Sequence, residues 1–136
     1  MTSPVRLYYV PCGWRSGNFG DMFSAEIVRK LSGRQVVGTG ETNEEIATAQ
    51  IVAVGSLAQN LPATFLGAAW GTGLMFEHAS IEARDCRVAA LRGKLTASRW
   101  PARPSCPLGD PGLLVRDTRP GIKRSLRWRV GIVPHY

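Results

Sequence analysis

The sequence of 136 residues lacks the patterns that define several large classes of protein. No apolar run approaches the ~20 residues that a membrane-spanning helix needs. The first residues, MTSPVRLYYVPCG, lack the charged start, the long apolar middle and the small-residue cleavage site of a signal peptide. We therefore expect a cytoplasmic protein, in which a contact with the inner face of the membrane would be peripheral.

Cysteine is scarce, and its spacing indicates neither a disulfide framework nor a zinc site. Cys12, Cys86 and Cys106 are odd in number and far apart, and no CxxC pair occurs. The two histidines, His78 and His135, are distant from each other and do not make a metal site. The phosphate-binding pattern GxxxxGK[ST] and the dinucleotide fingerprint GxGxxG are both absent. The sequence thus predicts no metal and no cofactor.

Acidic residues are scarce in the second part of the chain. Residues 1–82 carry five basic and seven acidic side chains, a net charge of −2. Residues 83–136 carry twelve basic and three acidic side chains, a net charge of +9. Such asymmetry favours an anionic partner for the second part: a phosphate, a nucleic acid or a membrane surface. The alternative is a solvated basic face without a partner.

Hydrophobic patterns predict alternating strands and helices. The predicted strands are continuous apolar or β-branched runs, at residues 5–10, 35–38, 51–56, 64–73 and 87–93. Helices are expected at residues 21–31, 42–49 and 94–100. Thr42 and Glu45 fit a capping box, and Gly33 fits a C-cap. This alternation predicts an α/β fold, in which a Rossmann-like, mainly parallel sheet carries helices on both faces.

The chain divides by composition into three parts. Residues 1–115 are interpreted as one Rossmann-like domain, which ends in a turn and a short buried stretch. Residues 116–125, RDTRPGIKRS, are polar, basic and interrupted by Pro-Gly, so we expect a linker. Residues 126–136 begin with another strand pattern, which we interpret as the first strand of a truncated second domain.

Glycines gather just after three of the predicted strands. Gly55 follows one strand, Gly71 and Gly73 follow the next, and Gly93 follows the third. Ligands of open parallel sheets bind at the carboxyl ends of the strands, where glycine lets the backbone approach closely. The clustering favours a binding cleft, although a tight turn explains any one of these glycines.

The stretch SGNFGD, residues 16–21, precedes the first predicted helix. Asp21 is expected to be the N-cap of that helix, where its carboxylate stabilises the first turn by roughly 0.5–2 kcal/mol. A second interpretation makes Asp21 a general base that takes a proton from a sugar hydroxyl. In the same loop Gly20 would let the backbone approach a ligand, and Asn18 would form a hydrogen bond with it.

Two further polar residues follow predicted strands or turns. Arg92 in LRGKLT stands at a strand end, and arginine binds phosphate or carboxylate through two parallel hydrogen bonds. The alternative is a surface arginine paired with a neighbouring acid. Asp110 in LGDPG is expected to stabilise a turn through its side chain.

Six motifs, in this order and at these spacings, resemble a single family. They are NFGD (18–21), VAVGSLAQ (52–59), AAWGTGL (68–74), ALRGKLTA (90–97), LGDPGLLV (108–115) and VGIVPHY (130–136). Together they resemble the polysaccharide pyruvyl transferases, particularly the exopolysaccharide ketal-pyruvate transferases. The resemblance spans essentially the whole chain.

This resemblance implies an activity and a fold. The family transfers a pyruvyl group from phosphoenolpyruvate to a sugar as a cyclic ketal in exopolysaccharide biosynthesis. Its fold is similar to that of two-domain glycosyltransferases of the GT-B type, of which this chain would be the N-terminal half. Basic residues that bind the donor would then lie beyond Tyr136. We therefore expect the chain of 136 residues to be inactive by itself.

The resemblance also assigns site residues. It maps the acidic residue of the family onto Asp21, its cleft-lining motifs onto Ser56, Thr72 and Arg92, and its Pro-His pair onto Pro134 and His135. We therefore predict catalytic roles for Asp21 and His135. Substrate binding is predicted for Asn18, Gly20, Gly55, Ser56, Gly71, Thr72 and Arg92.

The expected partners follow from the same assignment. They are phosphoenolpyruvate and a sugar or lipid-linked oligosaccharide acceptor, with peripheral membrane contact through the basic C-terminal third and no nucleic acid. Two alternatives stay open. One is a nucleic-acid-binding module built on the basic residues around Trp128. The other is a fragment of a GT-B-type glycosyltransferase that uses a nucleotide sugar.

Overall fold

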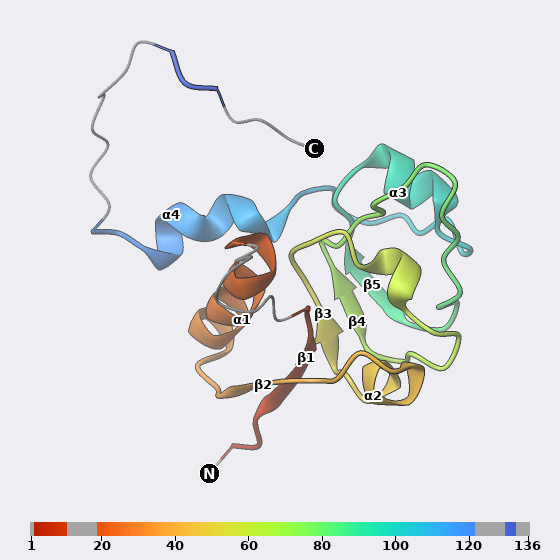
Figure 1. Ribbon diagram of the computed structural model, residues 1–136, viewed down its shortest axis with the longest axis horizontal. Helices are drawn as coiled ribbons and strands as arrows, with labels where there is room; N and C mark the ends of the chain where they lie inside the picture. The colour runs from red at the N-terminus through yellow and green to blue at the C-terminus, as the bar shows by residue number, and fades with distance from the viewer. Residues whose placement is uncertain (1, 11–18, 122–129, 133–136) are drawn as a thin grey trace.

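The computed structural model describes residues 2–10, 19–121 and 130–132 (Figure 1). Its strands are β1 (Val5–Tyr8), β2 (Val36–Gly38), β3 (Ile51–Val52), β4 (Ala68–Trp70) and β5 (Arg87–Ala90). Its α-helices are α1 (Phe19–Ser32), α2 (Asn43–Ala47), α3 (Lys94–Arg99) and α4 (Val115–Thr118). Two short 3₁₀ helices are η1 (Ala58–Asn60) and η2 (Pro111–Leu114). Among these helices, none has the length and apolar character needed to cross a membrane.

The five strands form one parallel sheet in the order β2-β1-β3-β4-β5. This confirms the predicted α/β fold with a Rossmann-like parallel sheet. The chain builds the sheet outward from β1 in both directions, so the order reverses between β1 and β3. At such a switch point, the helices that follow the two strands cover opposite faces, which opens a crevice at the carboxyl ends.

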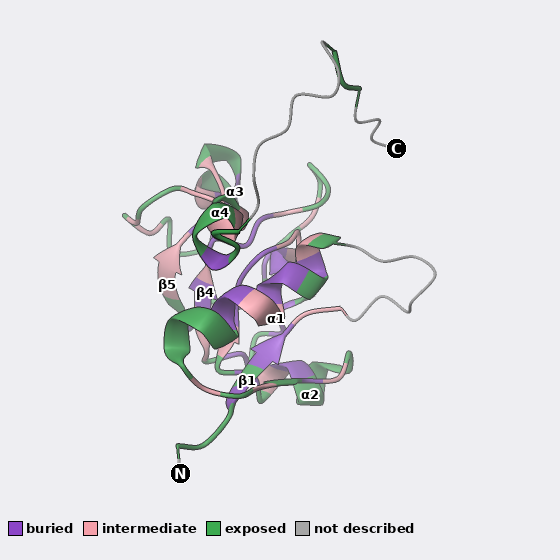
Figure 2. Ribbon diagram, turned by 90° about the vertical axis from the view of Figure 1, so that its left-hand side faces the viewer, coloured by how far each residue is buried: buried purple, intermediate pink, exposed green. Residues whose placement is uncertain are grey.

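Helices cover both faces of the sheet, as predicted, because successive strand residues point to opposite sides. On one face Leu7 packs with Phe23 and Ile27 of α1. On the other face Tyr8 belongs to a core with Ile46 of α2 and the residues around α3. Figure 1 shows α1 and α4 together on one side and α2 and α3 on the other. In Figure 2 the buried parts of β1 and α1 appear in purple.

The central strands are shorter than their apolar runs predicted. β3 has only Ile51–Val52 where a strand over 51–56 was expected, and β4 has only Ala68–Trp70 where one over 64–73 was expected. Ala53 and Val54 are buried nevertheless, although they lie beyond the strand. An apolar run indicates that its residues are buried. Both strands and the turns packed at their ends are buried, so the run does not show where the strand ends.

Helix α1 begins at Phe19, two residues before the predicted start, so Asp21 is not its N-cap. Asp21 lies inside the first turn instead. The rings of Phe19 and Phe23 stack with their centroids 5.6 Å apart, and this contact one turn apart favours the earlier start. At the other end, Gly33 has a φ of 64° and its N–H donates to the Arg29 carbonyl, which confirms the predicted C-cap.

The capping box predicted for the second helix is confirmed. The backbone N–H of Glu45 donates to Thr42 Oγ1 at 3.3 Å, and the backbone N–H of Thr42 donates to Glu45 Oε2 at 3.2 Å. Both bonds link residues three apart, which is why the local sequence was sufficient to predict them.

The beginning of the predicted linker is part of the folded domain. Residues 116–118 belong to α4, and the Thr118 carbonyl accepts a hydrogen bond from Lys30 Nζ at 2.9 Å. Arg119 Nε donates to Glu26 Oε1 of α1 at 2.9 Å. The basic side chain that suggested a solvated linker is thus paired across to α1. Residues 122–129 and 133–136 lie outside the described residues, and the described residues 130–132 are not in a strand.

Candidate functional site

The residues predicted to form a site gather at the carboxyl edge of the sheet. Seven of the nine lie in the described part of the chain, namely Gly20, Asp21, Gly55, Ser56, Gly71, Thr72 and Arg92. They occupy the first turn of α1 and the segments that follow β3, β4 and β5. The other two, Asn18 and His135, lie outside the described residues.

Asp21 and Gly55 meet at the switch point between β1 and β3. Asp21 is 6% exposed. A Cβ added to Gly55 would lie 2.7 Å from Oδ1 of Asp21. Gly55 also has a φ of 116°, a conformation that side chains rarely adopt. Glycine is therefore required there twice, by the backbone conformation and by the close approach of the carboxylate.

Burial raises the pKa of the Asp21 carboxyl above its ordinary value. A position near a helix N-terminus would by itself favour the charged form. Desolvation is the larger effect here, because it disfavours the carboxylate that leaves water. A carboxylate with a raised pKa is a stronger base, so burial strengthens Asp21 as a candidate general base.

The pH dependence of stability should report this burial. The pKa of Asp21 is raised in the folded state above its ordinary value of 3.8. Its stabilising contribution is therefore fully present below the unfolded pKa and is lost as the pH rises through the folded pKa. We expect Asp21→Asn to gain stability relative to the wild type over that interval, as measured by urea denaturation between pH 3 and pH 8. A difference that stays constant with pH would contradict the raised pKa.

Thr72 connects the segments that follow β3 and β4. It is fully buried, and its Oγ1 donates to the Gly55 carbonyl at 3.1 Å and accepts from the Leu57 N–H at 3.3 Å. The Gly73 N–H donates to the same Gly55 carbonyl at 3.0 Å. With no exposed surface, Thr72 acts on the site by holding Gly55 in place rather than by contacting a ligand.

Replacing Thr72 with valine should destabilise the protein by about 1–3 kcal/mol, because it leaves the buried Leu57 N–H without an acceptor. Thr72→Ser keeps the hydroxyl and removes one methyl group, which should cost about 1 kcal/mol. Urea denaturation of the two variants measures the difference. If serine proves as damaging as valine, the hydrogen bonds of Thr72 are not what the fold depends on.

Arg92 is held in a fixed position at the same edge. Its Nη1 donates to Ser56 Oγ and its Nη2 donates to the Leu74 carbonyl, both at 2.6 Å. The guanidinium lies against Gly73, where an added Cβ would come within 2.4 Å of Nε. The alternative interpretation paired Arg92 with a neighbouring acid. Among the described residues the ion pair found joins Arg119 and Glu26. Within the described part of the chain, Arg92 is thus a positioned cation that is not paired with an acid.

Gly71 has a structural explanation. Its φ is 81°, and an added Cβ would lie 2.1 Å from Pro111 Cδ. Pro111 opens η2, and the predicted turn role of Asp110 is confirmed because its Oδ1 accepts from the Gly112 N–H at 2.8 Å. For this glycine the tight-turn interpretation is the better supported, since Pro111 rather than an open cleft meets its bare α-carbon.

A further polar pair joins the end of β1 to η1. Asn60 Nδ2 donates to the Tyr8 hydroxyl at 3.0 Å. Burial raises the pKa of Tyr8, the hydrogen bond from Asn60 lowers it, and the carboxylates of Glu41 and Asp21 raise it further. Asp21 is the smallest of these influences on the pKa of Tyr8, which packs on the face of the sheet opposite to α1. The sequence carried no signal for this pair, since a tyrosine in a strand is ordinarily a core residue.

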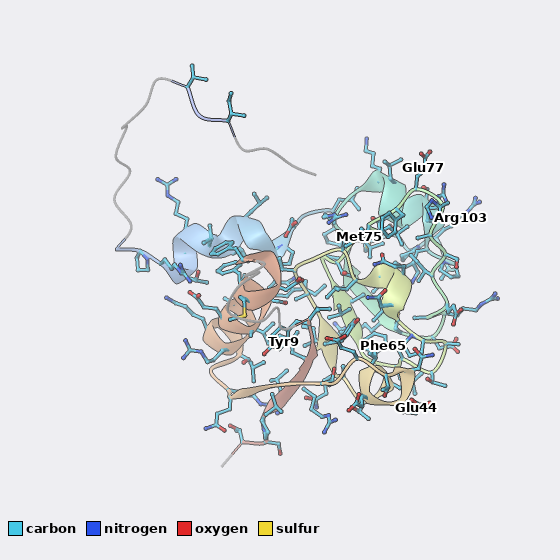
Figure 3. All side chains as sticks on the ribbon, in the orientation of Figure 1. Tyr9, Glu44, Phe65, Met75, Glu77 and Arg103 are labelled. Atoms are coloured by element: carbon cyan, nitrogen blue, oxygen red, sulfur yellow. The ribbon has the colours of Figure 1, made fainter. Side chains whose placement is uncertain are left out.

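A groove lies beside this network, between the segment after β4 and α3. It has a volume of about 650 Å³ and is lined by Leu74, Met75, Phe76, Glu77, Arg92, Gly93, Lys94, Leu95, Thr96 and Arg99. We call it the α3 groove; Met75 and Glu77 are labelled beside α3 in Figure 3. Arg92 belongs both to the groove and to the network around Ser56.

The arrangement can bind an anion and accept a proton at one edge of a parallel sheet. Within the described residues there is no cluster of three or more side chains that could hold a metal ion. Comparisons with family models, with curated proteins and with solved structures find no match to this chain.

Proposed function

We propose that this chain provides the sugar-binding side of a polysaccharide pyruvyl transferase. The observation that carries the proposal is the buried carboxylate of Asp21, seated on Gly55 at the switch point of the sheet. The motifs NFGD, VAVGSLAQ, AAWGTGL and ALRGKLTA, which are separate in sequence, all contribute to this edge. The parallel strands bring these motifs to one edge of the sheet, which is the edge where ligands of such sheets bind.

The chemistry assigned to Asp21 is general-base catalysis. Protonation of C3 of phosphoenolpyruvate makes C2 electrophilic, and a sugar hydroxyl attacks C2 while Asp21 accepts its proton. The C–O bond to phosphate then breaks, and a second hydroxyl of the sugar attacks C2 to close the ketal. Of the two hydroxyl protons, one is balanced by the proton gained at C3 and the other leaves with the phosphate. His135, outside the described residues, is proposed as the second catalytic group, the acid that protonates C3.

Arg92 supplies positive charge for the anionic donor in this proposal. Its two hydrogen bonds to Ser56 and Leu74 fix the guanidinium before a ligand arrives. A cation positioned in advance stabilises developing negative charge without reorganising during the reaction. The phosphate or the carboxylate of phosphoenolpyruvate is the group that it would contact.

Two measurements test this function. The full-length gene product, given phosphoenolpyruvate and a panel of hexosides with two neighbouring free hydroxyls, is expected to release phosphate only when a sugar is present. In the isotope-labelled chain, the active sugar is expected to shift the amide resonances of Gly20, Asp21, Gly55 and Ser56.

The alternatives give different results in the same experiments. Transfer from a nucleotide sugar, with no reaction of phosphoenolpyruvate, would replace the proposal with a glycosyltransferase. Salt-sensitive binding of a random oligonucleotide, with no effect of any sugar, would replace it with a nucleic-acid-binding module.

A further inference from the structure

The α3 groove combines apolar and basic side chains. Its apolar lining comes from Leu74, Met75, Phe76 and Leu95, and its basic lining comes from Arg92, Lys94 and Arg99. Glu77 is the one acidic residue among the described residues that line it. An apolar surface with a basic rim is complementary to an amphiphile of negative charge.

The apolar side chains of the groove project into solvent. Leu95 is 85% exposed, Met75 is 60% exposed and Phe76 is 53% exposed. Single exposed apolar side chains are ordinary, whereas several around one groove are typical of an interaction surface. Phe76 is held in orientation by stacking on His78, with ring centroids 5.7 Å apart.

The positive charge around the groove is not neutralised within the described residues. The ion pair found there joins Arg119, which follows α4, to Glu26 of α1, and neither residue lines the groove. Lys94 and Arg99 therefore have no acidic partner among the described residues. Arg92 donates to a hydroxyl and to a carbonyl rather than to an acid. The groove thus carries three cations and one acid among its described lining residues, a balance that favours an anionic partner.

We propose that the α3 groove is the surface through which the protein docks on an anionic membrane. Leu95, Met75 and Phe76 enter the boundary between headgroups and acyl chains, while Lys94 and Arg99 contact the lipid phosphates. Each basic residue near such a surface contributes about 1 kcal/mol. A lipid layer closes around a side chain that projects as far as Leu95 does, whereas a rigid partner would need a matching pocket.

This docking goes beyond the proposed function and does not depend on it. The basic C-terminal third suggested a membrane contact without naming a surface. The α3 groove names one, and it includes Met75 and Phe76, which follow β4 and lie outside that third. Arg92 belongs to the groove and donates to Ser56, so the membrane would lie beside the edge of the sheet that carries Asp21.

Vesicle flotation tests the proposal. The protein is expected to float with phosphatidylcholine vesicles that contain about one third phosphatidylglycerol, and to float at least about tenfold less with phosphatidylcholine alone. Leu95→Glu and Lys94→Glu should each reduce the binding to anionic vesicles by about tenfold or more. Circular dichroism and thermal denaturation establish that both variants remain folded, as their exposed positions lead us to expect.

Three further variants provide controls. Leu66→Glu alters an apolar residue that is 70% exposed but lies before β4, and Arg84→Glu reverses an exposed charge before β5; both positions precede their strands and so lie at the opposite edge of the sheet. Neither should alter flotation by more than about twofold. The double variant Lys123→Glu/Arg124→Glu should retain the preference for anionic vesicles. No binding to either vesicle, equal binding to both, or a loss confined to the Lys123/Arg124 variant would overturn the proposal.

Discussion

Replacement of Asp21 by asparagine in the full-length gene product is expected to lower the rate of sugar-dependent phosphate release by about two to four orders of magnitude. The amide has almost the size of the carboxylate but cannot accept the proton of the attacking hydroxyl. Because burial raises the pKa of Asp21, removing the charge should not destabilise the fold at neutral pH. Steady-state rates with phosphoenolpyruvate and the active sugar, together with the midpoint of urea denaturation, measure the two effects.

Asp117→Asn is the matched control for this experiment. Asp117 is an exposed residue of α4, so the same chemical change there should leave the rate and the stability as they are. If Asp21→Asn lost stability in proportion to its rate, Asp21 would be a structural residue of the first turn of α1. An unchanged rate would exclude Asp21 as the base.

Replacement of Gly71 by alanine is expected to destabilise the protein by about 3 kcal/mol or more. A residue other than glycine at a φ of 81° costs about 1–3 kcal/mol. The new methyl group would also overlap Pro111 Cδ, 2.1 Å away, and overpacking of this kind adds about 1–3 kcal/mol. Urea denaturation measures the loss, and proteolysis near residue 111 should accelerate because η2 is displaced.

Gly109→Ala is the control for the Gly71 variant. A Cβ on Gly109 would meet nothing within 4 Å, so alanine there should cost less than about 1 kcal/mol. Gly109 and Gly71 belong to the same small region, where Pro111 packs on Gly71. Equal effects of the two substitutions would show that chain stiffness, not the contact with Pro111, sets the cost.

Most features that depend on nearby residues were predicted correctly from the sequence, although the N-cap predicted at Asp21 was wrong because α1 begins at Phe19. The capping box of Thr42 and Glu45 and the C-cap at Gly33 each involve residues within one turn of a helix. The parallel sheet followed from the alternation of apolar runs with amphipathic segments, since only crossover connections join strands in that pattern. Local hydrogen bonding and hydrophobic periodicity are properties of short windows, which a sequence displays directly.

Features that depend on the packing of distant segments were missed or misjudged. The apolar run over 51–56 predicted a strand of that length, yet the run continues past Val52 into the buried turn that carries Gly55. The basic run after residue 115 predicted a linker, yet Arg119 pairs with Glu26 across α1. In each case the sequence displays the chemical type of a residue. It does not display the distant residue that packs against it or pairs with it.

The sequence by itself determined the fold class, the switch of charge along the chain and the set of polar residues that follow the strands. Only the tertiary structure decided which of them act together. In the folded chain the carboxylate of Asp21 lies against Gly55, and the buried Thr72 donates a hydrogen bond to the Gly55 carbonyl. Gly71 leaves the space in which Pro111 packs. The pKa of Asp21 rises for the same reason, because burial is produced by the chain that folds over the carboxylate and not by the residues beside it in sequence.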